Sequence, residues 1–149
     1  MIRFSSLEDV RAAIGSEIGP SAALHIDQSR IDAFAAATDD PQWIHTDPVR
    51  AAGGPYGATI AHGYLTLALL PRFGRELFEI DFGSARLNYG LNKARFPSPV
   101  RVDSSLRATA TILEVSELSQ GAMIAIRYLL DAGSAKPACI AESVMLVVD

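Results

Sequence analysis

The chain has 149 residues, of which 49% are hydrophobic and 20% are charged, and its formal net charge is −4. This composition predicts one folded domain over residues 1–149, excludes intrinsic disorder, and argues against a nucleic-acid backbone as the main partner. The single cysteine excludes an intrachain disulfide, the start of the chain lacks a secretory signal, and no segment approaches the ~20 apolar residues of a membrane span. We therefore expect a cytoplasmic protein with neither nucleic acid nor membrane as a partner.

The N-terminal segment predicts a short helix followed by a short strand. Ser5 and Glu8 have the spacing of a capping box, so we expect a helix that runs to about residue 14 and ends at Gly15. Gly19 and Pro20 then form a break, after which residues 22–26 are expected as a strand.

A second helix and a polar loop are expected next. Asp27 is the predicted N-cap of a helix over residues 28–38, whose apolar side chains recur at helical spacing. Residues 39–57 hold three prolines, three glycines, the only tryptophan and a cluster of Asp and His, which is typical of a functional loop. Within it, Asp47 and Pro48 predict the cap and first residue of a short helix over residues 48–52.

The remaining chain changes from helix to strands. Residues 61–78 are apolar on nearly every side, which predicts a buried helix of ~27 Å with a kink or joint at Pro71. Alternation over residues 86–91 and 100–102 precedes three β-rich segments, 106–115, 122–130 and 138–148, with hairpin turns at 119–121 and 131–134. A helix that is apolar all round requires a sheet around it. We therefore predict the α+β class and the hot-dog fold, a curved antiparallel β-sheet wrapped around a long central α-helix.

The densest polar cluster lies in the loop before that helix. Asp40 and His45 are five positions apart, so a carboxylate and an imidazole can converge on one water molecule as an acid/base pair. Pro41 and Trp43 are expected to keep this pair partly dry. From spacing alone an equally good explanation is that Asp40 caps a turn and His45 fills a polar niche.

The sequence His62-Gly63 marks the start of the predicted central helix. Backbone N–H groups are unpaired there, and Gly63 has no side chain to keep a developing oxyanion away, although close packing alone also explains a glycine. His45, Asp47 and His62 have the ingredients of a two-His, one-carboxylate metal site, but their spacing and the short chain argue against one. We expect Cys139 to fill the core, so it is not a candidate nucleophile.

Two stretches resemble the MaoC-like dehydratases, also described as (R)-specific enoyl-thioester hydratases. They are residues 34–45, FAAATDDPQWIH, and residues 60–64, IAHGY. In this resemblance Asp40 and His45 fall on the catalytic pair, and Gly63 falls on the glycine whose N–H meets the thioester oxygen.

Three positions depart from the family pattern, namely Asp39 for Gly, Gln42 for Asn and Trp43 for Pro. This variant resembles a subgroup that is similar to nodulation protein N and to mycobacterial 3-hydroxyacyl-thioester dehydratases. Residues 88–100 and 135–139 match that subgroup as well.

The resemblance implies reversible hydration of trans-2-enoyl thioesters to (R)-3-hydroxyacyl thioesters. Asp40 would act as the base on water, and His45 would orient that water and share in proton delivery to the α-carbon. The Gly63 N–H would stabilise the enolate-like oxygen. No metal or redox cofactor is implied, because coenzyme A or an acyl-carrier pantetheine is part of the substrate. The resemblance also implies a homodimer with an acyl tunnel near its interface. Substrate contacts are expected from Gln42, Trp43, His62, Asn88, Tyr89, Asn92 and Arg95, the last near the tunnel mouth.

Two other functions fit the same fold. A hot-dog thioesterase would cleave the acyl thioester and release a free thiol. A non-catalytic acyl-thioester-binding module would keep the tunnel without turnover.

Overall fold

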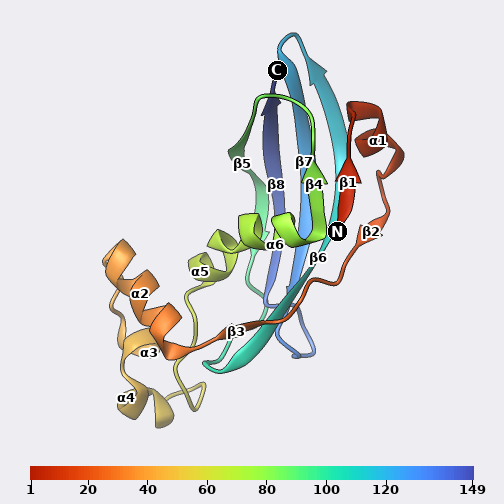
Figure 1. Ribbon diagram of the computed structural model, residues 1–149. Helices are drawn as coiled ribbons and strands as arrows, with labels where there is room; N and C mark the ends of the chain where they lie inside the picture. The colour runs from red at the N-terminus through yellow and green to blue at the C-terminus, as the bar shows by residue number, and fades with distance from the viewer.

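Four long antiparallel strands form the body of the molecule in the computed structural model, which describes residues 1–149 (Figure 1). They are β5 (Ala85–Arg95), β6 (Ser104–Leu118), β7 (Gly121–Asp131) and β8 (Cys139–Val148). The sheet order is β2-β6-β7-β8-β5, so β5 lies at an edge. The predicted segments 86–91, 106–115, 122–130 and 138–148 and both hairpin turns are confirmed, and β5 and β6 extend beyond their predicted ranges.

Short strands complete the sheets. β2 (Glu17–Ile18) and β3 (Leu24–Ile26) both pair with β6, while β1 (Ile2–Phe4) pairs in parallel with β4 (Phe78–Ile80). The strand predicted over residues 22–26 therefore begins two residues later than expected. The alternation over residues 100–102 forms no strand, only an isolated bridge between Ile60 and Arg101. β1, β2 and β4 have too few residues for a period-2 pattern to reveal them.

The first helix is capped one residue later than predicted. α1 (Leu7–Ala12) has Ser6 as its N-cap, and the Ser6 hydroxyl accepts from the N–H of Asp9 while the Asp9 carboxylate accepts from the N–H of Ser6. The motif is the predicted capping box, but Asp9 takes the place expected for Glu8. α2 (Gln28–Thr38) has the predicted boundaries and the predicted cap, because Asp27 Oδ1 accepts from the N–H of Arg30 at 2.9 Å.

The central helix is in two pieces rather than one. α5 (Gly63–Ala68) and α6 (Leu70–Leu77) meet at Leu69, and Pro71 lies in the first turn of α6, so the predicted joint is confirmed. The expectation that this segment is buried on all sides is wrong, because the Tyr64 side chain is 71% exposed. The sheet covers one side of the helix pair only, where Phe73 and Leu77 pack into the core.

The core lies between α5–α6 and the concave face of the sheet. It is a continuous cluster of 26 buried residues that draws on every long strand except β5 and on helices α1, α2, α5 and α6. α2 and two short helices form a separate lobe at one end of the sheet, beside the start of α5 (Figure 1). Cys139 is fully buried in the core, as expected, and burial raises the pKa of its thiol to about 11. No helix in the structure has both the length and the apolar character needed to cross a bilayer.

Candidate active site

The segment predicted as a polar loop contains two short helices. α3 (Trp43–Thr46) places His45 on its inner side, and α4 (Pro48–Ala52) follows directly. The prediction for the start of α4 is confirmed, because Asp47 Oδ1 accepts from the N–H of Arg50 at 3.0 Å and Pro48 begins the helix. The cap at Asp47 and the start of α4 at Pro48 fix the direction in which the chain leaves α3, with His45 on its buried side.

The end of α2 determines where Asp40 lies. Asp39 adopts the left-handed conformation with φ of 54°, and the N–H of Asp40 then bonds back to the Ala35 carbonyl oxygen at 3.1 Å. This turn reverses the chain and brings Asp40 over the start of α5. The Asp40 side chain is 51% exposed, so its carboxylate remains accessible to water.

His45 is buried, and one of its ring nitrogens is already committed. Its Nδ1 lies 2.7 Å from the Ile60 carbonyl oxygen, which can only accept, so Nδ1 carries a proton and Nε2 holds the lone pair in the neutral ring. Burial lowers the pKa of His45 below its ordinary value, and this outweighs the opposing effect of the bond to Ile60. The ring is therefore neutral near pH 7 and presents Nε2 as a hydrogen-bond acceptor.

His62 connects Asp40 to His45. Its Nε2 lies 3.0 Å from the Asp40 carbonyl oxygen and 3.8 Å from Asp40 Oδ2, while its ring stacks on His45 with centroids 3.7 Å apart. The Phe34 ring also packs on His62, at 5.0 Å between centroids. One polar atom from each of Asp40, His45 and His62 lies within 4.8 Å of the others. A single water can bridge groups up to about 5.6 Å apart at ordinary hydrogen-bond lengths, and one ring nitrogen of His45 lies within that reach of the Asp40 carboxylate.

The stacked geometry does not fit a metal ion. Imidazole lone pairs lie in the ring plane, and a bound ion sits about 2.0–2.1 Å from each nitrogen. The His45 and His62 rings are nearly parallel, with 22° between their planes, so an ion in the plane of one ring lies well outside the plane of the other. In the metal alternative for His45, Asp47 and His62, Asp47 has another role, because its Oδ1 caps α4.

Gly63 begins α5, and its N–H forms no backbone hydrogen bond. A Cβ at this position would lie 2.9 Å from the Phe96 ring, so any other residue requires that ring to shift and packing favours a glycine. The same lack of a side chain leaves the amide approachable next to Asp40 and His62. Close packing and an approachable amide therefore both fit the surroundings of Gly63. Phe96, which contacts this position, carried no sequence signal that could have identified it.

Gln42 and Trp43 lie at the start of α3. Trp43 is half-buried against α4, with the Arg50 guanidinium 4.3 Å from its ring centroid, and Gln42 is exposed and contributes its main-chain carbonyl to the start of α3. Pro41 is exposed too. The His45 ring stacks on His62, which in turn packs on Phe34. Shielding of the pair by Pro41 and Trp43, and a role for Gln42 or Trp43 in substrate binding, stay predictions.

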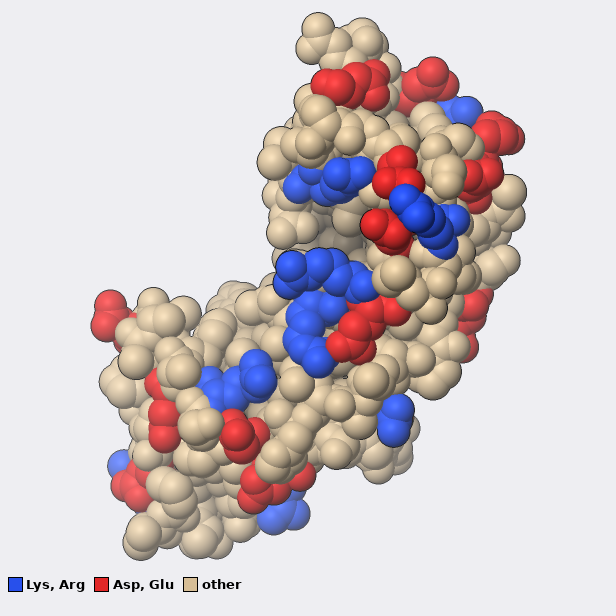
Figure 2. All heavy atoms as spheres, viewed as in Figure 1, with Lys and Arg blue, Asp and Glu red and all other residues tan.

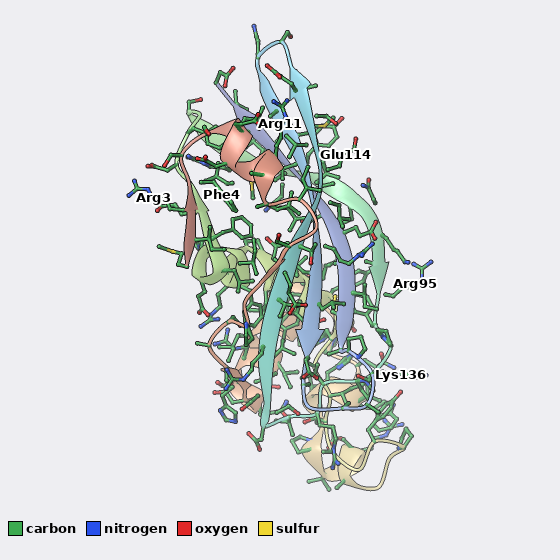
Figure 3. The ribbon with its side chains drawn as sticks, turned by 90° about the vertical axis from the view of Figure 1, so that its right-hand side faces the viewer. Arg3, Phe4, Arg11, Arg95, Glu114 and Lys136 are labelled. Carbon is green, nitrogen blue, oxygen red and sulfur yellow. The ribbon has the colours of Figure 1, made fainter.

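The other predicted contact residues lie on β5. Asn88, Tyr89, Asn92 and Arg95 are all exposed, and Arg95 points away from the sheet (Figure 3). The structure does not bring them together with Asp40 and His45. Asn88 alone of the four lines a cavity of about 960 Å³ between α5–α6 and the sheet.

None of Asp40, His45, His62 and Gly63 lines this cavity. Its lining includes Leu67, one turn past Gly63, which is about 6 Å along the helix. It continues over apolar side chains that include Leu70, Phe78 and Met145, with Arg75 and Arg86 also in the lining. Figure 2 shows the molecule hollowed on the face viewed, with cationic side chains beside the hollow.

Two polar residues next to His45 were missed in the sequence. Gln28 Nε2 donates to the His45 carbonyl oxygen at 2.7 Å, and the Thr59 hydroxyl donates to Gln28 Oε1 at 2.6 Å. Gln28 was placed only as the first residue of α2, and Thr59 is separated from it by 31 positions. A lone glutamine at the start of a helix carries no sequence signal for such a contact.

Comparison with known proteins identifies relatives over almost the whole chain. Residues 9–132 match the family model of the MaoC like domain. The chain is 47% identical over 150 residues to 3-hydroxyacyl-thioester dehydratase Z of Mycobacterium tuberculosis, covering 99% of each protein. It is 46% identical over 111 residues to Nodulation protein N of Rhizobium leguminosarum bv. viciae, covering 73% of this chain and 69% of that protein.

Solved structures share the fold. A MaoC-like dehydratase from Rhodospirillum rubrum superposes with a TM-score of 0.77 at 22% identity, covering 95% of each chain. The R-hydratase PhaJ1 from Pseudomonas aeruginosa gives a TM-score of 0.70 at 24% identity, covering 91% of this chain and 82% of that one. At these identities the likeness establishes the hot-dog architecture.

Proposed function

The chain belongs to the MaoC-like dehydratase family, and from that membership we propose that it hydrates trans-2-enoyl thioesters reversibly to (R)-3-hydroxyacyl thioesters. The relative of nearly half-identical sequence and equal length is named a 3-hydroxyacyl-thioester dehydratase. The single observation that supports the chemistry is the Asp40–His45 arrangement, in which a buried neutral imidazole and an accessible carboxylate can hold one water.

Each group has a distinct task in the proposed reaction. Asp40 takes a proton from the water as the water oxygen bonds to C3 of the enoyl group, while His45 Nε2 accepts the second water hydrogen and orients the molecule. The electron pair of the double bond shifts toward the thioester oxygen, which the free N–H of Gly63 stabilises. The proton held by Asp40 is then delivered to C2, so the net change is addition of one water.

The substrate supplies its own carrier, so the proposed reaction needs no metal and no redox cofactor. Coenzyme A or an acyl-carrier pantetheine enters as a portion of the thioester. We assign the cavity of about 960 Å³ to the acyl group, because Leu67 in its lining lies one turn from Gly63 and 9 of its 17 lining residues are hydrophobic. We place the phosphates of the carrier outside it, and the exposed Arg95 stays a candidate contact for them.

We infer that the working form is a homodimer. β5 is an edge strand, and its apolar side chains are exposed, among them Tyr89 at 68% and Leu91 at 47%. Tyr64 of α5 is exposed on the same side as Phe96, whose ring it meets edge-on with centroids 6.2 Å apart. A long apolar edge next to an uncovered helix face supports pairing with a second copy.

The test is a direct assay of the purified protein with crotonyl-CoA. Hydration is followed by loss of the enoyl absorbance, the product is analysed for (R) chirality, and free thiol is titrated in parallel. Formation of the (R)-3-hydroxyacyl product without thiol release supports the proposal. Thiol release identifies a thioesterase, whereas tight acyl-CoA binding with neither product identifies a non-catalytic binding module; either result contradicts it.

A further inference from the structure

Gln28 joins three segments that meet at the candidate site. Its side chain reaches from the first turn of α2 to the main chain of α3 and to the segment that precedes α5. Its amide nitrogen donates to the His45 carbonyl oxygen at 2.7 Å and to Asp32 Oδ1 at 2.8 Å, and its amide oxygen accepts from the Thr59 hydroxyl at 2.6 Å. Thr59 is 1% exposed, so this last contact is dry.

These contacts allow one orientation of the amide. A carbonyl oxygen and a carboxylate oxygen can only accept, so the nitrogen of Gln28 must face His45 and Asp32. Both amide hydrogens are then used, and the oxygen takes the Thr59 hydroxyl proton. A carboxylate at this position would instead face two acceptors at hydrogen-bond distance, so Glu cannot replace Gln without disturbing the site.

The same segments also hold the imidazole of His45. The Ile60 carbonyl oxygen fixes Nδ1 at 2.7 Å, and the Ile60 N–H donates to the Ile44 carbonyl oxygen at 3.0 Å. Thr59 is the neighbour of Ile60, and Gln28 bonds to both Thr59 and His45. Gln28 therefore sets the distance between the backbone that carries His45 and the backbone that fixes its ring.

We propose that Gln28 is a positioning residue that holds His45 Nε2 in the place where it can share a water with Asp40. This inference rests on the proposed hydration. Gln28 itself touches neither the water nor the acyl group, so its loss lowers kcat while KM for the enoyl thioester stays within about threefold. Displacements of about 1 Å at a reacting group can cost about 100-fold in rate, so we expect Gln28→Ala to lower kcat by about 10–100-fold.

The variant Gln28→Glu should show a pH dependence of kcat that a residue with only a structural role would not produce. In Gln28→Glu the new carboxyl group faces Asp32 of α2 and the carbonyl of His45, with His62 stacked behind the His45 ring. Its protonation restores one donor, so the kcat of this variant relative to that of the unaltered protein at the same pH rises as the pH falls from 7 toward 5. Gln120→Glu, in the exposed turn between β6 and β7, makes the same chemical change and leaves the rate and its pH profile unchanged.

Two further variants separate positioning from loss of folding. Thr59→Val removes the hydroxyl at nearly constant volume and lowers kcat, whereas Thr59→Ser keeps the donor and retains it. All rates are measured well below the unfolding temperature of each variant. In the His45→Gln background, Gln28→Ala produces no further loss, because a residue that acts through His45 has no effect once His45 is absent.

The outcomes distinguish this inference from the proposed function. If His45→Gln lowers kcat strongly but folded Gln28→Ala retains full activity, Gln28 has no positioning role and the hydratase proposal stands. Additive losses in the double variant, or a flat pH profile for Gln28→Glu, overturn the inference in the same way. If the unaltered protein does not hydrate enoyl thioesters, both proposals fail together.

Discussion

The lobe that carries Asp40 and His45 and the face formed by β5 and α5 are opposites in their use of polar and apolar groups. In the lobe, polar side chains are buried and paired, as His45 is with Ile60 and Thr59 is with Gln28. On the other face apolar side chains are exposed, including Tyr64 at 71% and Tyr89 at 68%. Buried polar groups are tolerated only when they are hydrogen-bonded. Exposing an apolar face to water costs free energy.

This contrast indicates which of the two regions has its side chains paired or covered within a single chain. The lobe pairs His45 and Thr59 internally, although Nε of Arg30 and Nδ1 of His62 are buried without a partner. The β5–α5 face has no internal partner for its exposed apolar side chains, and the cavity lies beside it. We therefore expect changes in the lobe to alter catalysis with little effect on assembly, and changes on the β5–α5 face to alter assembly first.

The largest effect is expected in the lobe. Asp40→Asn and His45→Gln should each lower kcat by at least about 100-fold, because each removes one of the two groups that we propose hold the water. The assay is crotonyl-CoA hydration, with circular dichroism to verify folding. Asp39→Asn, one residue away, and His25→Gln, on the exposed face of β3, are matched controls that should retain full rates. Full activity in either site variant would refute the assignment of the pair.

The second effect is expected on the β5–α5 face. Tyr89→Asp places a charge at the centre of the exposed apolar edge and should weaken self-association by about 30-fold or more, which corresponds to about 2 kcal/mol. Sedimentation over a range of protein concentrations measures the shift. Val49→Asp, at an 88% exposed position on α4, introduces the same charge and should leave the association unchanged. A protein that is monomeric at every concentration before mutation would remove the basis for the comparison.

The third effect concerns pH and again belongs to the lobe. Because burial lowers the pKa of His45 in the folded state, the unfolded chain binds a proton more readily as the pH falls below the ordinary value near 6.5. Stability should therefore decrease as the pH is lowered from 7 through 6, and it should be fully present above that range. Thermal unfolding across this range measures the slope, which should be shallower in His45→Gln. An equal slope in both proteins would show that His45 is not held neutral by burial.

The smallest effect is expected at the end of α2. Asp39 adopts a left-handed conformation, which glycine adopts without steric penalty, so Asp39→Gly should raise the free energy of unfolding by about 0.5–1 kcal/mol. Ala36→Gly, at an exposed position inside α2, should lower it by a similar amount because glycine disfavours a helix interior. Chemical denaturation of both variants measures the difference. If Asp39→Gly is destabilising, the Asp39 side chain makes a contribution that exceeds its strain.

Local structure could be predicted from the sequence where it depends on one short segment. The cap at Asp27, the boundaries of α2, the start of α4 at Pro48 and the joint near Pro71 all depend on neighbours within one or two turns. The shift of the first capping box from Ser5 to Ser6 shows the limit of this approach, since both serines are followed three positions later by an acidic residue. Local pattern determines that a cap exists, and packing chooses between adjacent candidates.

The amino-acid sequence alone determined the α+β class, the family, and the proximity of Asp40 to His45, because these follow from patterns and from residues five positions apart. Only the tertiary structure revealed that His62 stacks on His45, that Phe96 covers Gly63, and that Gln28 spans 31 positions to meet Thr59. It also revealed that the central helix leaves Tyr64 exposed. The physical reason is that periodicity describes which residues are apolar, whereas burial and long-range hydrogen bonds depend on which surfaces the folded chain brings together.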